Sequence, residues 1–237
     1  MFVVVLLFLL ATLAVKFKKI TIMAGIFGCA IGSCIWIING YTGLILMATF
    51  FLLGTLATMW GIDIKYKNGF AENETSMRDA GQVFANAGIP FLLCLINVIY
   101  PSQSNVINLM IAGSFSAATA DTLSSELGNR YGKNFYNILT FRRDTKGMNG
   151  VVSMEGTGFG VLGSGIIASV YALLNSWDMH FFIIILAGTF GNIVDSILGA
   201  TLERKNYLTN NQVNFLNTAA GAIVSLLLYI LNSNSMN

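Results

Sequence analysis

The chain has 237 residues, of which 55% are hydrophobic and only 10% are charged. A soluble domain carries about 25% charged residues, so the composition excludes an ordinary soluble enzyme and indicates a polytopic membrane protein. The formal net charge of +2 excludes nothing by itself, because the positions of Lys and Arg matter more than their sum in a membrane protein. We expect the partners to be the membrane and its lipids, and we expect no nucleic acid.

Apolar runs recur along the whole chain and predict an all-α bundle. We expect a single transmembrane domain, residues 1–237, with about eight spans at Met1–Val15, Ile20–Ile38, Tyr41–Trp60, Gly81–Tyr100, Val106–Glu126, Gly150–Leu174, Phe181–Leu202 and Val213–Leu231. The first run is short and would cross only a thin or locally thinned bilayer. We expect it to be a retained anchor, because Lys16, Lys18 and Lys19 follow its apolar residues instead of preceding them.

The distribution of basic residues predicts the orientation. With eight spans, all 13 Lys and Arg residues fall in loops or span ends on one side of the membrane. The connecting segments on the other side, 39–40, 101–105 and 175–180, contain neither Lys nor Arg. Because cytoplasmic loops carry an excess of Lys and Arg, we expect both termini outside and the basic loops in the cytoplasm.

Carboxylates lie inside two of the predicted spans. Asp121 and Glu126 end the fifth span, and Asp195 lies in the seventh. A carboxylate within a span is costly, so it usually faces a polar cavity and marks a functional site. Five spans bring polar or small residues toward the same side: Arg78, Gln82 and Asn86; Asp121, Ser125 and Glu126; Ser153, Glu155 and Thr157; Asn192, Asp195, Ser196 and Gly199; Asn214, Asn217 and Gly221. For any single Asn or Ser, a polar contact between helices is an alternative interpretation.

Two of these stretches resemble each other. Placing Asp195 on Asp121 aligns Ser196 with Thr122 and also pairs two aliphatic residues one position later. This alignment suggests that two spans present an aspartate to one site. Chance similarity between apolar helices explains it about as well.

The acids and the basic loops together favour phosphate chemistry with a divalent metal. Mg²⁺ is typically held by one or two carboxylates and by substrate phosphates, which suits Asp121, Glu126 and Asp195. Glycines such as Gly128 would let backbone N–H groups approach phosphates. The basic residues that would neutralise them are Arg130, Lys133, Arg142, Arg143 and Lys146. These basic residues alone would equally serve orientation and attraction to anionic lipid.

Several ordered motifs also point to a known family. The stretches concerned are RDAGQVFANAG (78–88), ATADTLSSELG (118–128), KGMNGVVSMEGTGFG (146–160), GNIVDSILGATLE (191–203) and NQVNFLNTAAGA (211–222). Over about residues 20–231, the chain resembles the phytyl-phosphate kinase and transmembrane protein nineteen family. A pattern of Asp121, Ser125, Gly128 and Gly132, followed by a turn with Lys146, is more distantly similar to CTP-dependent dolichol and phytol kinases. That turn reads K-S-x-E-G in those enzymes and K-G-M-N-G here.

The resemblance implies a membrane-embedded kinase of lipid metabolism. It would transfer a phosphoryl group from cytoplasmic CTP or ATP, with Mg²⁺, to an isoprenoid alcohol or monophosphate. The implied catalytic residues are Asp121, Asp195 and Lys146, and the implied metal ligands are Asp121, Glu126 and Asp195. The residues assigned to binding nucleotide and phosphates are Arg78, Asn86, Ser125, Gly128, Asn149, Ser153, Asn192 and Asn214.

Two other functions stay open at this point. A CTP-dependent lipid nucleotidyltransferase would share the membrane setting and the metal, but it would release pyrophosphate. A transporter would also use carboxylates inside the membrane, although its polar residues should gather at the midplane. The sequence leaves open the lipid's chain length, the choice of alcohol or monophosphate, the nucleotide and the oligomeric state.

Overall fold

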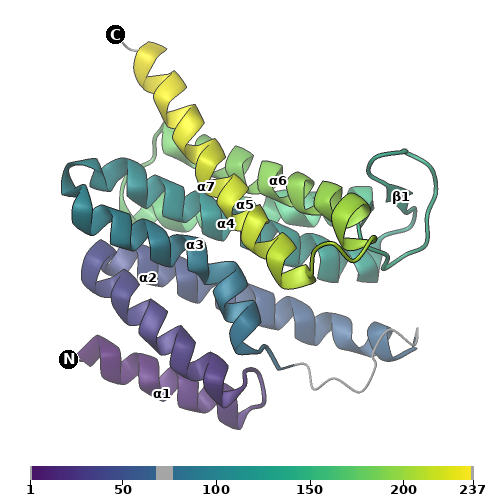
Figure 1. Cartoon of the computed structure of the whole chain (residues 1–237), viewed down its shortest axis with the longest axis horizontal. Helices are drawn as coiled ribbons and strands as arrows, with labels where there is room; N and C mark the ends of the chain where they lie inside the picture. Colours follow the sequence, from purple (N-terminus) through teal and green to yellow (C-terminus); the bar gives the residue numbers. More distant parts are fainter. Residues whose placement is uncertain (1, 68–76, 236–237) are drawn as a thin grey trace.

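The fold is given by a computed structural model, which describes residues 2–67 and 77–235 (Figure 1). The described residues form seven α-helices, which confirms the all-α class. The helices are α1 (Phe2–Lys16), α2 (Ile22–Lys67), α3 (Ala80–Ile99), α4 (Ser104–Tyr131), α5 (Met154–Leu174), α6 (Met179–Leu198) and α7 (Asn210–Ser235). Two short turns adjoin them, η1 (Pro101–Gln103) before α4 and the π-helical turn η2 (Gly199–Glu203) after α6.

The helices occupy all of the predicted spans. Six described helices are long and apolar enough to cross a membrane, whereas α1 is shorter, at 15 residues. Helix α2 bends at Gly40, whose φ of 70° and ψ of −155° suit glycine because it lacks a Cβ. This kink coincides with the loop predicted between the second and third spans, so α2 consists of two helical segments. The number of membrane crossings stays a prediction.

Several helix boundaries differ from the predicted ones. Helix α2 continues to Lys67 and α4 continues to Tyr131, so both predicted polar loops begin as helix. Hydropathy marks where a chain leaves the hydrocarbon, and helical hydrogen bonding can continue beyond that point. Helix α5 begins at Met154, four residues later than predicted, because Ser153 caps it. Residues 68–76 of the first polar loop lie outside the described part of the chain.

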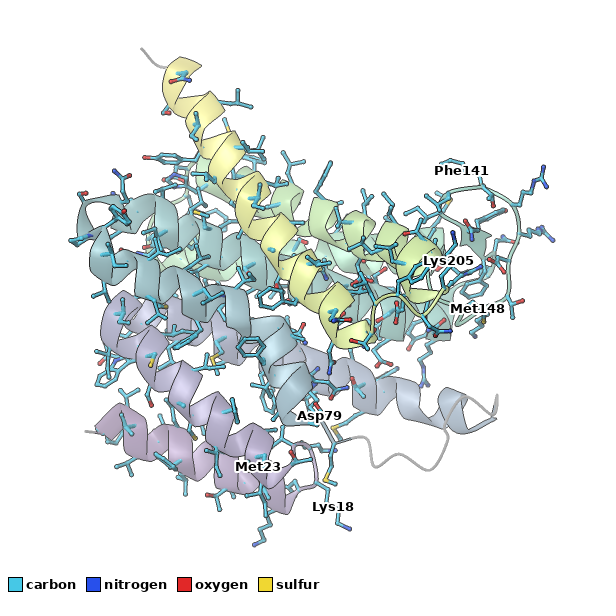
Figure 2. All side chains as sticks on the ribbon, viewed as in Figure 1. Lys18, Met23, Asp79, Phe141, Met148 and Lys205 are labelled. Atoms are coloured by element: carbon cyan, nitrogen blue, oxygen red, sulfur yellow. The ribbon has the colours of Figure 1, made fainter. Side chains whose placement is uncertain are left out.

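The two ends of the bundle differ in character. Helix α1 begins and α7 ends on the same side of the bundle (Figure 1). Figure 2 shows Lys18, Met148 and Lys205 toward the other side, where the α4–α5 loop also lies. An even number of crossings requires both helix ends on one side, as observed. Which side faces the cytoplasm stays a prediction.

Helix α4 is the centre of the bundle. Its apolar window is 78% buried, against 33–39% for the other five candidate spans. It packs against α2, α3, α5, α6 and α7. Lipid tails are as apolar as leucine, so helices associate in membranes mainly through close packing of small residues. Helix α4 accordingly carries a buried run of Gly, Ala, Ser and Thr residues between Ala112 and Ala120, which Phe115 alone interrupts.

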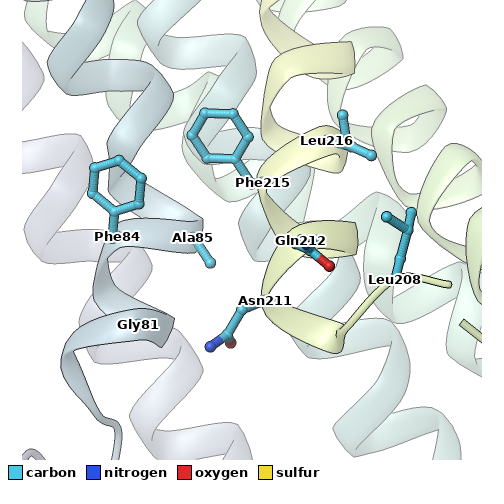
Figure 3. A pocket seen from close by; sticks show the side chains of 8 residues that line it. All are labelled: Gly81, Phe84, Ala85, Leu208, Asn211, Gln212, Phe215 and Leu216. Carbon is cyan, nitrogen blue, oxygen red and sulfur yellow. The ribbon is translucent and has the colours of Figure 1, made fainter. Parts of the chain in front are cut away.

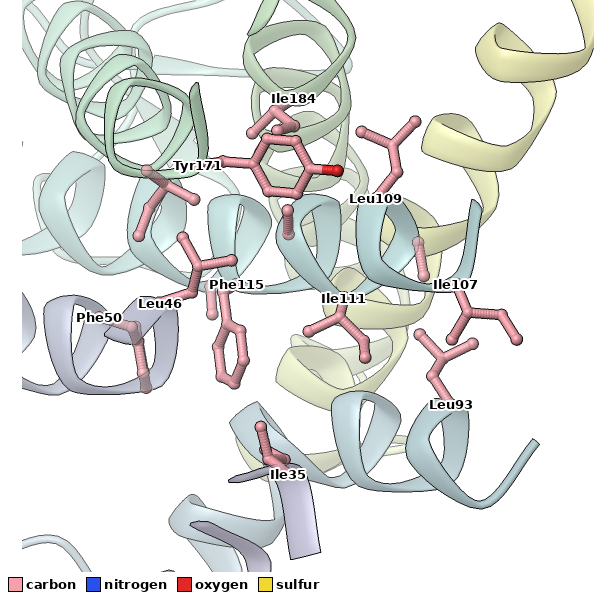
Figure 4. Close-up of a cluster of buried hydrophobic side chains, with 14 of the residues drawn as sticks. Ile35, Leu46, Phe50, Leu93, Ile107, Leu109, Ile111, Phe115, Tyr171 and Ile184 are labelled. Atoms are coloured by element: carbon pink, nitrogen blue, oxygen red, sulfur yellow. The ribbon is translucent and has the colours of Figure 1, made fainter. Parts of the chain in front are cut away.

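Larger side chains fill the half of the bundle away from the α4–α5 loop (Figure 4). Phe115 of α4 is fully buried and stacks on Phe50 of α2, with ring centroids 6.2 Å apart. Leu109 and Ile111 of the same helix are also fully buried. Neighbouring helices complete this cluster with Ile35, Leu46, Leu93, Tyr171 and Ile184. The core is therefore apolar at one end of α4, and polar residues are left for the other.

Short backbone pairings fix the loops at that polar end. Strand β1 (Tyr136–Asn137) pairs antiparallel with β2 (Val151–Val152), which makes the α4–α5 connection a small hairpin. Arg78 pairs through its backbone with Lys19 and Thr21, so the start of α3 is tied to the α1–α2 turn. Sequence patterns predicted neither pairing. The single domain proposed for residues 1–237 stays a prediction.

Candidate functional site

The carboxyl groups of Asp121 and Asp195 meet between α4 and α6. They lie within hydrogen-bonding reach of each other, and both side chains are half-buried. Each residue lies in the half of its helix nearer to the α4–α5 loop. Two carboxylates so close together cannot both stay ionised unless they bind a cation, and otherwise they share a proton. The structure thus places together the two aspartates that the alignment of their stretches related to each other.

Asn217 of α7 adjoins this pair. Its side chain is fully buried next to the Asp195 carboxyl group. The amide lies close enough to the Asp195 carboxyl group to act on it as a hydrogen-bond donor, but among the described residues neither amide atom makes a hydrogen bond of good geometry, and neither does Asp195 Oδ2. Buried polar groups are nearly always paired, so these three atoms make the site suited to a polar ligand or a cation. Sequence analysis assigned a binding role to Asn214, one turn earlier, and only placed Asn217 on the same face.

Glu126, the third predicted metal ligand, points toward a different neighbour. Thr58 Oγ1 of α2 donates a hydrogen bond to Glu126 Oε1 at 3.3 Å. Glu126 follows Asp121 by five positions, so its side chain is rotated by about 140° around α4 at 3.6 residues per turn. No group of three or more His, Cys, Asp or Glu in the described part of the chain is arranged to hold a metal ion. The three-carboxylate metal site therefore stays a prediction.

Glu203 is an acid near the pair that sequence analysis did not assign. It is half-buried at the end of η2, and its charge acts on both Asp121 and Asp195. It follows Asp195 by eight residues, a spacing that returns to the same stripe of a helix. That spacing could have identified it from the sequence. Glu203 makes this end of the bundle more acidic and so favours a bound cation.

Arg78 lies between α2 and α4, near Glu126. Its guanidinium group covers the rings of Phe50 and Phe51, at 5.4 and 5.7 Å from their centroids. Gly54 leaves the space that the guanidinium fills, since a Cβ there would overlap Arg78 Nη2. The charge of Glu126 acts on Arg78, whereas no described contact links Arg78 to Asp121 or Asp195. Its predicted phosphate-binding role stays a prediction.

Arg204 fastens the α4–α5 loop to the end of α6. Its Nη2 atom donates to Asp144 Oδ2 at 2.7 Å, and its Nε atom donates to the backbone oxygen of Asn149 at 2.5 Å. Gly150 has a φ of 71° and packs against Ala200, where a Cβ would overlap the backbone. The hairpin therefore folds over η2, at the end of the bundle where Asp121 and Asp195 lie.

Lys146, the predicted catalytic lysine, lies within this hairpin. Its Nζ atom is 5.5 Å from the centroid of the Phe135 ring, a cation–π contact. No described contact joins Lys146 to Asp121 or Asp195. Asn149 contributes its backbone oxygen to Arg204, and its side chain is exposed. Both residues are thus held at the correct end of the bundle, and their contact with phosphates stays a prediction.

The Asp144→Asn variant should have a looser hairpin than the native protein. Hydrogen bonds from Arg204, the Thr145 N–H and Asn137 hold the pKa of Asp144 below its usual range. A depressed folded pKa contributes stability above the unfolded value of about 3.9, and this stability is lost as pH falls through the folded value. Hydrogen exchange of residues 134–152, corrected for intrinsic rates, should accelerate in the native protein as pH falls from about 5 toward about 2.

In Asp144→Asn, the same residues should already exchange rapidly near neutral pH. Asp178→Asn is the matched control, since Asp178 caps α6 at the opposite end. Its exchange in residues 134–152 should equal that of the native protein. Native-like exchange in Asp144→Asn at neutral pH would show that the ion pair does not hold the hairpin.

Three other predicted binding residues lie where helices pack closely. Ser153 Oγ accepts a hydrogen bond from the Gly156 N–H at 3.1 Å and so caps α5. A Cβ on Gly128 would lie 2.7 Å from the Gly156 Cα atom, so α4 and α5 nearly touch there. Asn192 is buried, and its Nδ2 atom would lie 2.8 Å from a Cβ on Gly160. Capping and close packing account for these residue types without a ligand.

The remaining predicted binding residues do not converge on the aspartates through any described contact. Asn86 Nδ2 donates to the Gln82 backbone oxygen at 2.9 Å. Ser125 is exposed, and its hydroxyl group donates to the Thr122 backbone oxygen at 3.2 Å. Asn214 is half-buried on the face of α7 that also carries Asn217. Of the predicted set, Asp121 and Asp195 are the residues that the structure joins.

A separate apolar cleft of about 520 Å³ lies between the first turns of α3 and α7 (Figure 3). Phe84 and Phe215 stack at its side, with ring centroids 5.8 Å apart and an interplanar angle of 9°. Its lining residues are Gly81, Phe84, Ala85, Leu208, Asn211, Gln212, Phe215 and Leu216. The cleft combines an apolar wall with two amide side chains at the polar end of the bundle, a lining that suits a lipid chain below a polar headgroup.

Comparisons with known proteins agree with this architecture. The family model "Integral membrane protein DUF92" matches residues 5–222. The Arabidopsis thaliana protein VTE6, chloroplastic, is 31% identical over 205 residues, which are 84% of this chain and 62% of that protein. The membrane protein MJ0933 of Methanocaldococcus jannaschii is 33% identical over 97% of this chain and 94% of its own length.

A third relative extends the comparison to cyanobacteria. The membrane protein sll0875 of Synechocystis is 32% identical over 92% of this chain and 86% of its own length. No solved structure matches the chain. The chain spans 62% of the plant protein's length, so that protein's activity as a whole is evidence only for a proposal about this chain.

Proposed function

Because the chain belongs to the DUF92 family of integral membrane proteins, as the phytyl-phosphate kinase motifs indicated, we propose that it is a membrane-embedded lipid kinase. It would transfer a phosphoryl group from a nucleoside triphosphate, CTP or ATP, to an isoprenoid monophosphate or alcohol. The observation that carries this proposal is the convergence of Asp121 and Asp195, from two different helices, beside the buried amide of Asn217.

The residues of this site fit a magnesium ion. Mg²⁺ prefers hard oxygen ligands and is usually held by one or two carboxylates and by substrate phosphates. Asp121 and Asp195 would supply the carboxylates, and Asp195 Oδ2 is an orphaned buried oxygen available for this role. A bound Mg²⁺ ion would neutralise part of the charge on the transferred phosphoryl group.

The protein's own residues would do the rest by positioning. Phosphoryl transfer requires the attacking and leaving oxygens to lie in line, with cationic groups around the phosphates. The hairpin that Arg204 holds over η2 brings Lys146 and other basic residues of the loop to the aspartates' end of the bundle. A monophosphate acceptor is already ionised and needs no general base. An alcohol acceptor would benefit from one, and Asp121 or Asp195 is the candidate.

The apolar cleft between α3 and α7 supports the lipid half of the proposal. It lies at the same end of the bundle as the aspartates, and Phe84 and Leu216 at its rim are 45% and 40% exposed. In a membrane, such exposed apolar side chains face lipid. An isoprenoid chain could pack there without leaving the bilayer, while only its headgroup enters the polar end.

The test is turnover by the purified protein in lipid nanodiscs with Mg²⁺, CTP or ATP, and phytyl or geranylgeranyl monophosphate or alcohol. The proposal predicts a phosphorylated lipid and one nucleoside diphosphate for each phosphoryl group transferred. Pyrophosphate with a CDP-lipid would replace it with a nucleotidyltransferase. No lipid product with any of these acceptors would overturn it.

A further inference from the structure

We infer that Asn217 is the third oxygen ligand of a divalent cation bound by Asp121 and Asp195. This inference rests on the proposed function only in its choice of Mg²⁺ as the natural ion. It assigns to α7 a role that the predicted three-carboxylate set gave to Glu126 of α4. The site would then draw one ligand from each of three helices.

The burial of Asn217 carries the inference. Its side chain is fully buried, and within the described part of the chain neither amide atom makes a hydrogen bond of good geometry, although the amide reaches the Asp195 carboxyl group. Leaving a buried polar group without a good hydrogen bond costs stability, so its presence at this position points to a ligand-binding role. The amide lies beside Asp195, whose Oδ2 likewise makes no such bond with the described residues. An amide oxygen is a normal ligand for a hard cation, which would satisfy both oxygens at once.

Small residues of three helices leave the space in which the Asn217 amide lies near the Asp195 carboxyl group. A Cβ on Gly191 of α6 would lie 2.7 Å from Asn217 Oδ1 and 2.5 Å from the Ala117 Cβ atom of α4. A Cβ on Gly221 of α7 would lie 2.7 Å from the same Ala117 atom. Helices α4, α6 and α7 therefore approach closely one turn away from the aspartates, and the absent side chain of residue 191 leaves room for the Asn217 amide.

Charge balance also favours an amide as the third ligand. Two ionised aspartates carry two negative charges, which one divalent cation cancels. A third carboxylate would leave a negative charge that the cation does not cancel, and such a charge is expensive inside a membrane. A neutral amide adds an oxygen ligand without adding charge. Glu126 instead contacts Thr58 on another side of α4, which agrees with a site that uses two carboxylates and one amide.

The test measures Mn²⁺ binding by electron paramagnetic resonance on the full-length protein in nanodiscs, with neither nucleotide nor isoprenoid present. The native protein should bind Mn²⁺ at one site, and excess Mg²⁺ should displace it. Asn217→Leu should weaken binding at least tenfold, and Asn217→Gln, which keeps a neutral amide oxygen, should retain it. Ser225→Ala, at a buried polar position about two turns further along α7, is the matched control and should bind as the native protein does.

Native affinity in Asn217→Leu, or no Mn²⁺ site in the native protein, would overturn the inference. If Asn217→Leu does not fold, the smaller Asn217→Ala decides: weakened Mn²⁺ binding in a folded protein supports the ligand role, and native affinity overturns it. The outcome is separable from the kinase assay. Mn²⁺ binding that depends on Asn217 in a protein without lipid kinase activity would keep this inference and reject the proposed function.

Discussion

Asp121→Asn and Asp195→Asn should each lower the rate of lipid phosphorylation by about 10³-fold or more. A metal ion supplies several kcal/mol of charge stabilisation in the transition state, and each 1.36 kcal/mol is worth about tenfold in rate. Each substitution removes one of two charged ligands and keeps the size of the side chain. The rate of lipid diphosphate formation in nanodiscs is the measurement.

Both variants should still fold and insert. Asparagine is cheaper than an ionised aspartate inside a membrane, so neither substitution adds a cost to insertion. The thermal unfolding temperature without added metal should therefore not fall. Asp178→Asn, at the opposite end of the bundle, is the control for the loss of one acid, and it should keep the native activity. A folded Asp121→Asn protein with native turnover would remove Asp121 from the catalytic site.

The double variant adds a sharper requirement. If Asp121 and Asp195 act as one unit, Asp121→Asn with Asp195→Asn should be no slower than either single variant, because residues of one unit are strongly non-additive. Independent roles would instead multiply the two losses. Rate measurements on the four proteins form a double-mutant cycle that separates these cases.

The positions of the helices could be predicted from the sequence because bilayer thickness fixes the length of an apolar run. Gly40 illustrates this, since the predicted break between two spans is the kink of α2. The ends of the helices could not be predicted as well. Helix α4 passes Glu126 and ends at Tyr131, because helical hydrogen bonds continue where the chain is already polar.

The candidate site was predictable only in part. Asp121 and Asp195 stand out as carboxylates in apolar helices, and simple helical geometry separates Glu126 from Asp121. The contacts of Lys146 and Asn149 depend on how a 22-residue connection between α4 and α5, residues 132–153, folds over η2. No short-range pattern specifies that fold. Asn217 was indistinguishable from Asn214 in sequence, and burial alone sets it apart.

The close packing of α4 against α5 gives the last prediction, which compares two glycines of α5. Gly156→Ala should lower the free energy of unfolding by about 1–3 kcal/mol, the usual cost of overpacking. A Cβ at residue 156 would lie 2.9 Å from the Ser124 backbone oxygen and 3.1 Å from the Gly128 Cα atom. Backbone atoms cannot move aside as a flexible side chain can, so α4 and α5 would have to separate.

Gly158→Ala is the matched control, because a Cβ there meets nothing within 4 Å. Alanine is the better helix former by about 0.5–1 kcal/mol, so this variant should be as stable as the native protein or more stable. Thermal unfolding in one detergent, followed by circular dichroism, compares the two. Equal unfolding temperatures would mean that the α4–α5 crossing is looser than described. If Gly156→Ala alone has a lower unfolding temperature and also a reduced turnover, the position of Asp121 depends on the α4–α5 crossing. Helix α4 contains both Asp121 and the residues that contact Gly156.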